Sequence, residues 1–135
     1  QSMEVNYIDA QGCSNPVPTI KQISVLSPPV PSITGNSLPC ASSVEVYVTE
    51  PGMTNYQWTV LPGGVITGGQ GTYAVTVVWQ TPGFSGMTVN YTTPGGCRAE
   101  FPTAKTITVL PTPVPVISGL SETTVGSTTT YTADI

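Results

Sequence analysis

Two stretches of this chain, residues 12–35 and 96–119, carry the same pattern of residues without a gap. The first reads GCSNPVPTIKQISVLSPPVPSITG and the second reads GCRAEFPTAKTITVLPTPVPVISG. The spacing is constant, because the positions of Cys13 and Cys97 differ by 84 (97 − 13 = 84), and the glycines that close the two stretches keep the same spacing. A shared register of this length indicates tandem units that repeat with this period.

The repeat divides the chain into three parts. Residues 1–27 are interpreted as the tail of one unit, residues 28–110 as a complete unit, and residues 111–135 as the beginning of the next. The two seams, Ser27–Pro31 and Pro111–Pro115, are rich in proline, which favours an extended and semi-rigid chain. The sequence therefore predicts an elongated array rather than one compact body.

The complete unit has the pattern of an all-β domain. Short runs rich in Val, Ile, Tyr and Thr alternate between turn signals that draw on 14 Pro and 14 Gly residues,. Turns recur about every 8–12 residues and delimit seven or so strands, which is typical of an immunoglobulin-like β-sandwich. The expected strands are residues 31–34, 44–49, 55–60, 65–67, 72–80, 87–91 and a closing strand that contains Ile107 and Val109.

The strand at residues 55–60 is expected to supply the centre of the core. Tyr56, Trp58 and Val60 alternate with polar residues, so they share one face of the strand,. Trp58 is interpreted as the core tryptophan of the sandwich rather than as a sugar-binding platform. The other positions expected in the core are Val75, Val77 and Val89.

Three further aromatic residues leave two interpretations open. Trp79 ends its strand close to a Pro-Gly turn, so it either packs in the core or forms a surface platform. Tyr47 shares its face with Glu45 and Thr49 and lies opposite a row of valines. It is either an exposed aromatic or a sign that both faces of its strand are buried. Together with Tyr73, these residues are the candidates for stacking against a carbohydrate ligand.

The three cysteines favour a disulfide in an exported protein. No C-x-x-C pair occurs, so neither a zinc site nor a thioredoxin-type site is predicted,. Cys40 and Cys97 fall in the same complete unit and are expected to pair with each other. Cys13 corresponds to Cys97 one period earlier, and its partner is expected before Gln1. Thr124 stands where the next unit would carry the counterpart of Cys40.

The composition argues against several classes of function. The chain has no histidine, the commonest general base and transition-metal ligand, and Glu45 and Glu50 are expected on opposite faces, so neither an enzyme nor a cofactor is predicted,. Three basic residues, Lys21, Arg98 and Lys105, cannot form a nucleic-acid-binding patch,. No apolar run is long enough to predict membrane insertion,.

The order of motifs in the complete unit resembles the PKD-like domains of Bacteroidota surface and secreted proteins. The resemblance rests on Ile33-Thr34-Gly35, Cys40, Tyr47 and Asn55–Trp58, and then on Gly69–Thr72, Val75–Val77, Trp79, Gly86–Val89 and Cys97. It covers the whole complete unit and extends into both flanks. Some PKD-type domains bind calcium, but the seven acidic residues here are scattered without a D-x-D cluster, so no metal site is predicted,.

The resemblance implies a non-catalytic stalk, spacer or gliding adhesin, exported through the outer membrane to the cell surface or the medium. It also implies that the chain is similar to cargo of the type IX secretion system. The expected partners are neighbouring repeats, surface polysaccharide, and the outer-membrane secretion or motility machinery. Two alternatives stay open, a carbohydrate-binding module and an accessory domain of a secreted hydrolase.

Overall fold

Strands, turns and irregular connecting segments make up the structure, a computed structural model that describes residues 1–134. No helix forms in this range, so none of these residues belongs to a helix that is long and apolar enough to cross a membrane. The predicted all-β class is therefore confirmed. Ile135, the last residue of the predicted third unit, lies outside the described residues.

Six strands form the central body, in two antiparallel sheets of three. One sheet has the order β3-β6-β5 and the other has the order β4-β7-β8. The bounds are β3 Val44–Val48, β4 Thr54–Val60, β5 Gly64–Gly68, β6 Ala74–Trp79, β7 Gly83–Thr92 and β8 Thr103–Val109. The buried side chains of both sheets form one cluster, so the body is a sandwich,. The predicted first strand at residues 31–34 is reduced to a single bridge between Thr34 and Val48.

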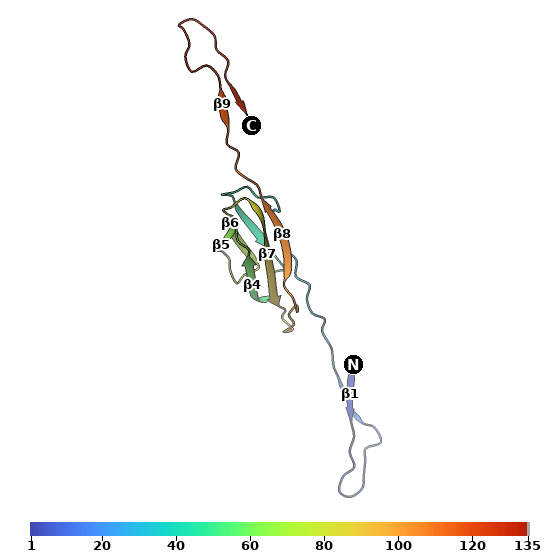
Figure 1. Ribbon diagram of the computed structural model, residues 1–135. Coiled ribbons are helices and arrows are strands. Elements are labelled where there is room, and N and C mark those ends of the chain that lie inside the picture. The colour runs from blue at the N-terminus through green and yellow to red at the C-terminus, as the bar shows by residue number, and fades with distance from the viewer. Residues whose placement is uncertain (135) are drawn as a thin grey trace.

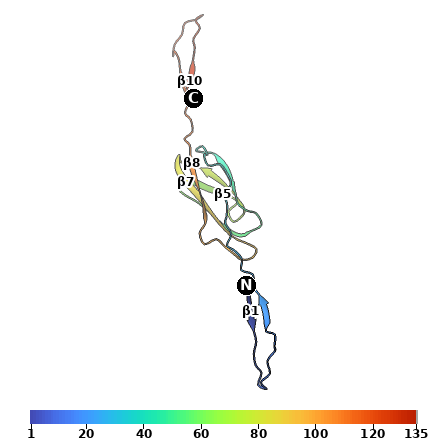
Figure 2. The ribbon, with the colours of Figure 1, turned by 90° about the vertical axis from the view of Figure 1, so that its right-hand side faces the viewer.

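Two hairpins flank the sandwich and lie beyond its opposite ends, which gives the molecule an elongated outline (Figures 1 and 2). The first hairpin pairs β1 (Ser2–Val5) with β2 (Thr19–Gln22), and the second pairs β9 (Val116–Ser118) with β10 (Thr132–Asp134). The loop of the first hairpin points away from the sandwich (Figure 1).

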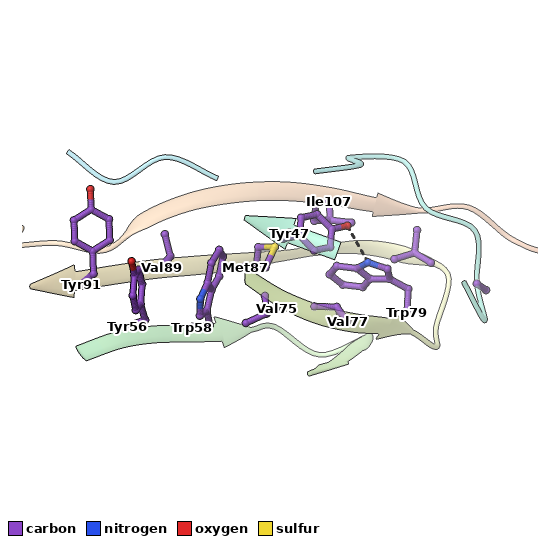
Figure 3. Close-up of a cluster of buried hydrophobic side chains, with 12 residues drawn as sticks. Tyr47, Tyr56, Trp58, Val75, Val77, Trp79, Met87, Val89, Tyr91 and Ile107 are labelled. Atoms are coloured by element: carbon purple, nitrogen blue, oxygen red, sulfur yellow. Dashed lines mark hydrogen bonds between the residues drawn. The ribbon is translucent and has the colours of Figure 1, made fainter. Parts of the chain in front are cut away.

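The core contains every residue that the sequence predicts for it. Tyr56, Trp58, Val75, Val77 and Val89 are all buried and face one another between the sheets (Figure 3). Alternation explains this placement, because every second residue of β4 and β6 points inward,. The remaining buried apolar side chains are Ala41, Tyr47, Trp79, Met87, Tyr91, Ile107 and Val109.

Tyr47 lies in the core, and the valines on the other face of β3 point outward. Tyr47 has no exposed surface, whereas Val44 and Val46 are 63% and 57% exposed. Of the two interpretations left open above, the exposed aromatic is therefore wrong, and so is burial on both faces of β3. A ring buries more apolar area than a valine, and its hydroxyl finds a partner when the backbone carbonyl of Asn36 accepts a 2.7 Å hydrogen bond,.

A glycine makes room for the Tyr47 ring. A Cβ atom on Gly35 would lie 2.3 Å from the ring carbon Cδ1, so the ring or the backbone would have to shift. The same arrangement occurs in the second hairpin, where a Cβ atom on Gly119 would lie 2.2 Å from Cδ1 of Tyr131. Each tyrosine follows its glycine at the same interval (47 − 35 = 12 and 131 − 119 = 12), and the two pairs are related by the period of the repeat (119 − 35 = 84).

The first hairpin has the strand register of β7 and β8, displaced by the same period. Met3 pairs with Lys21 as Met87 pairs with Lys105 (87 − 3 = 84). All four residue pairs of β1 and β2 have a counterpart in β7 and β8 at this offset. The sequence match also extends upstream of residue 12, because Met-x-Val-Asn-Tyr occurs at residues 3–7 and again at 87–91.

Candidate functional site

The predicted aromatic platform does not exist at the surface. Trp79 is fully buried, and its indole nitrogen donates a 3.0 Å hydrogen bond to the hydroxyl of Tyr47 (Figure 3). The two rings meet edge to face with centroids 6.2 Å apart. Tyr73 is 49% exposed, but the two residues expected to form the platform with it, Trp79 and Tyr47, are buried. Trp79 and Tyr47 are therefore core residues, and the prediction that they stack against a ligand is wrong.

Burial also fixes the protonation of Tyr47. Loss of solvent raises the pKa of its hydroxyl, the hydrogen bond from Trp79 lowers it, and the nearby negative charge of Glu45 raises it,. The net effect is a raised pKa, so the phenol stays neutral and can donate to Asn36 while it accepts from Trp79. The pair is a structural element with no reactive group exposed.

The predicted disulfide between Cys40 and Cys97 is not present, because all three cysteines are free thiols. The fold keeps the two residues apart. Cys40 pairs with Leu110, and the neighbouring Val109 pairs with Gly83, the first residue of β7. Cys97 comes after Thr92, the last residue of the same strand. A ten-residue strand spans about 30 Å,, and a disulfide requires Cα atoms within about 7 Å.

The acidic residues do not assemble a metal site within residues 1–134. Glu45 accepts hydrogen bonds from Asn36 and Ser43. Glu50 lies at the end of the sandwich where the chain enters from the first seam. Its carboxylate accepts hydrogen bonds from the backbone N–H of Ser32 (3.1 Å), the Ser32 hydroxyl (2.5 Å) and the Thr49 hydroxyl (2.7 Å).

These contacts lower the pKa of the Glu50 carboxyl. Burial alone would raise its pKa, but the hydrogen bonds from Ser32 and Thr49, with contributions from the backbone, outweigh it and lower the pKa from 4.5 to about 2,. The side chain is therefore ionised at neutral pH. An ionised acceptor makes short, strong hydrogen bonds, so Glu50 fastens the residue that follows the seam to the body of the sandwich.

A second contact holds the same seam from the other sheet. The hydroxyl of Thr103, the first residue of β8, donates a 2.7 Å hydrogen bond to the carbonyl of Pro31. The side chain of Leu26 lies against Gly95, where a Cβ atom would be 2.6 Å from its Cδ1 carbon. The chain before the sandwich is thus attached to it at three places, by Glu50, Thr103 and Gly95.

The opposite end of the sandwich carries the exit of the chain. The backbone N–H of Ala41 donates to the carbonyl of Leu110, and the N–H of Leu110 donates to the carbonyl of Pro39, both at 2.8 Å. The N–H of Thr108 also donates to the carbonyl of Ser37 at 2.9 Å. The segment before β3 therefore runs beside the end of β8, and Cys40 lies where the chain leaves the sandwich.

The candidate functional site is thus formed by the two ends of the sandwich, where the chain enters from the first seam and leaves into the second. These two regions are called the entrance joint and the exit joint. Sequence reasoning located both proline-rich seams but missed the contact between Ser32 and Glu50. No local motif signals this contact, because the two residues are 18 positions apart. The contact is also particular to this joint, since one period later Val116 and Asp134 occupy the two positions.

Comparison with known proteins agrees with this geometry. A family model described as a PKD-like domain matches residues 27–109, which include both sheets of the sandwich. This range differs by one residue at each end from the complete unit that the repeat delimits. A search of curated proteins found no match to the chain.

Proposed function

This chain belongs to the PKD-like domain family, and from that premise we propose that it is a non-catalytic spacer segment of a tandem array. PKD-like domains are a structural and adhesive type of domain, generally non-catalytic, and typical of extracellular or surface proteins. The finer proposal is a stalk or gliding adhesin at the bacterial cell surface, exported as cargo of the type IX secretion system. Its closest partners are the neighbouring repeats of the same chain.

The proposal rests on a difference in solvent exposure between residues that are 84 positions apart and occupy corresponding places in the repeat. Met87, Val89 and Tyr91 are at most 3% exposed inside the sandwich. Their counterparts one period earlier, Met3, Val5 and Tyr7, are 63–77% exposed, although Met3 and Val5 have the same strand register as Met87 and Val89.

An apolar strand face of this kind is stable only when a second sheet covers it. In the central unit, the sheet β3-β6-β5 covers the corresponding face of β7 and β8. We therefore interpret the first hairpin as the last two strands of a preceding sandwich.

The second hairpin supports the same interpretation from the other end. Thr132 pairs with Ser118 as Val48 pairs with Thr34, and the Tyr131 hydroxyl donates to Leu120 as the Tyr47 hydroxyl donates to Asn36. Each of these correspondences has the offset of the repeat (132 − 48 = 84). The second hairpin therefore has the geometry with which the central sandwich begins.

The test is a duplicated chain, defined as residues 1–111 followed by residues 28–135. It contains the whole present chain plus one additional period. We expect two folded sandwiches in series, with a maximum dimension in small-angle X-ray scattering that exceeds that of the original chain by about 30 Å or more, since one ten-residue strand spans that length,. A compact particle, or a chain in which only one sandwich folds, would contradict the array.

A further inference from the structure

The two thiols of the sandwich lie at opposite ends, and each faces a joint. Cys40 is exposed at the exit of the chain, beside Leu110. Cys97 closes the turn between β7 and β8 at the entrance, where the N–H of Thr93 donates to the carbonyl of Cys97 at 2.8 Å and the N–H of Cys97 donates to the Thr93 hydroxyl at 3.1 Å. Each thiol is therefore placed to meet a neighbouring unit rather than its own.

Leu26 shows what lies next to Cys97 across the entrance joint. Its side chain contacts Gly95, two residues before Cys97. Leu26 is also the counterpart of Leu110 one period earlier (110 − 26 = 84). In the central sandwich, the residue paired with Leu110 is Cys40. The corresponding residue of a preceding sandwich would pair with Leu26 in the same way, and so would lie beside the turn that carries Cys97.

We propose that a disulfide links consecutive sandwiches across their joint, from the Cys40 position of one unit to the Cys97 position of the next. This inference rests on the proposed tandem array. In the bond-forming step, the two thiols lose two protons and two electrons to a disulfide of the exporting compartment, a small-molecule or protein disulfide, which is reduced to two thiols. The new sulfur–sulfur bond replaces two S–H bonds.

The position of Cys13 agrees with this connectivity. Its turn repeats that of Cys97, since the N–H of Asp9 donates to the carbonyl of Cys13 at 2.9 Å. Cys13 lies in the loop of the first hairpin, which points away from the central sandwich (Figure 1). It is therefore placed at the entrance joint of the preceding unit and not near Cys40 or Cys97.

The linkage is selective among joints. Thr124 occupies the position of Cys40 in the following unit, and the local backbone is the same, because Ser127 donates to Thr124 as Ser43 donates to Cys40. A unit with threonine at this position cannot cross-link to its successor. The sequence thus specifies joints with a covalent link and joints without one.

The duplicated chain tests the disulfide directly, because its internal joint brings together Cys40 of the first copy and Cys97 of the second. Cys13 is changed to serine so that it cannot compete for either cysteine of the joint. After oxidation with oxidised glutathione, non-reducing proteolysis and mass spectrometry should find one dominant cross-link between those two cysteines. Cys40→Ser in the first copy or Cys97→Ser in the second copy should abolish it, and the matched changes, Cys40→Ser in the second copy and Cys97→Ser in the first, should leave it unchanged.

Small-angle X-ray scattering tests the tandem array separately from the disulfide, because it shows whether two sandwiches fold in series. Two folded sandwiches in series whose joint thiols remain free, or form only a glutathione adduct, would overturn the disulfide and leave the array intact. A dominant cross-link between Cys40 and Cys97 of one copy would also overturn it. A duplicated chain that does not fold into two sandwiches would overturn both proposals.

Discussion

The indole nitrogen of Trp79 and the hydroxyl of Tyr47 are 3.0 Å apart in a core from which solvent is excluded. The hydroxyl in turn donates to the carbonyl of Asn36, in the segment that precedes β3. One phenol therefore satisfies two polar groups and connects β6, β3 and the chain that enters the sandwich. Buried polar groups without partners are costly, so this connection has a measurable consequence.

Tyr47→Phe should destabilise the sandwich although it keeps the ring. The change leaves the N–H of Trp79 and the carbonyl of Asn36 without their partner, which costs about 1–3 kcal/mol for a buried group. Urea unfolding followed by tryptophan fluorescence measures this loss. Tyr73→Phe is the control, because Tyr73 is half exposed and lies outside the core cluster. Equal stability of the two variants would contradict the assigned role of Tyr47.

Stability should fall in acid through Glu50. Its folded pKa is about 2 and its ordinary value is near 4.5, so the folded state favours the ionised form. The stabilisation is fully present above pH 4.5 and is lost as the pH falls towards 2,. The urea midpoint of the wild-type chain, measured across this range, should decrease more steeply than that of Glu50→Gln. Parallel curves would show that the contact with Ser32 has no influence on folding.

Gly64→Ala should lower the stability of the sandwich far more than Gly68→Ala, although the two glycines are the first and last residues of the same short strand, β5. A Cβ atom on Gly64 would lie 2.6 Å from the Trp79 ring and 2.9 Å from Val60. On Gly68 the nearest atom, in Thr76, is 3.9 Å away. Overpacking of a core typically costs about 1–3 kcal/mol. Thermal unfolding of the pair gives the comparison, and a smaller loss for Gly64→Ala would mean that Trp79 can move aside.

The sequence predicts the strands and the core because both depend on local alternation. Trp58 and Val77 could be assigned inward from their neighbours alone. Tyr47 could not, because both faces of β3 carry apolar residues and only the tertiary structure selects the one that packs on Trp79. The disulfide prediction failed for a related reason. It used the fact that Cys40 and Cys97 share a unit, whereas their separation is set by the length of β7, which pairing with β8 determines.

The proline-rich seams can be recognised in the sequence, but the contacts that the chain makes there cannot. Proline-rich composition marks the seams, since proline restricts the backbone directly. The contacts that fix the entrance, between Glu50 and Ser32 and between Thr103 and Pro31, join residues that are 18 and 72 positions apart. Such pairs leave no periodic signal in a single sequence. The spacing of 84 residues is the exception, because it is visible in the sequence and the residue pairs of β1 and β2 recur at this offset in β7 and β8.

Hydrogen exchange should divide the described chain into a protected centre and two labile hairpins. The strands β9 and β10 pair over three residues each and are exposed throughout, as are β1 and β2. Two-stranded hairpins without a covering sheet are marginally stable in water, whereas β4, β7 and β8 enclose the core. Exchange followed by mass spectrometry on the monomer should therefore show rapid labelling at residues 116–134 and slow labelling at residues 87–91. In the duplicated chain, residues 87–91 of both copies should label slowly, because each copy then belongs to a complete sandwich, whereas residues 116–134 at the end of the chain should still label rapidly. Strong protection of residues 116–134 in the original monomer would contradict the interpretation of that hairpin as an incomplete unit.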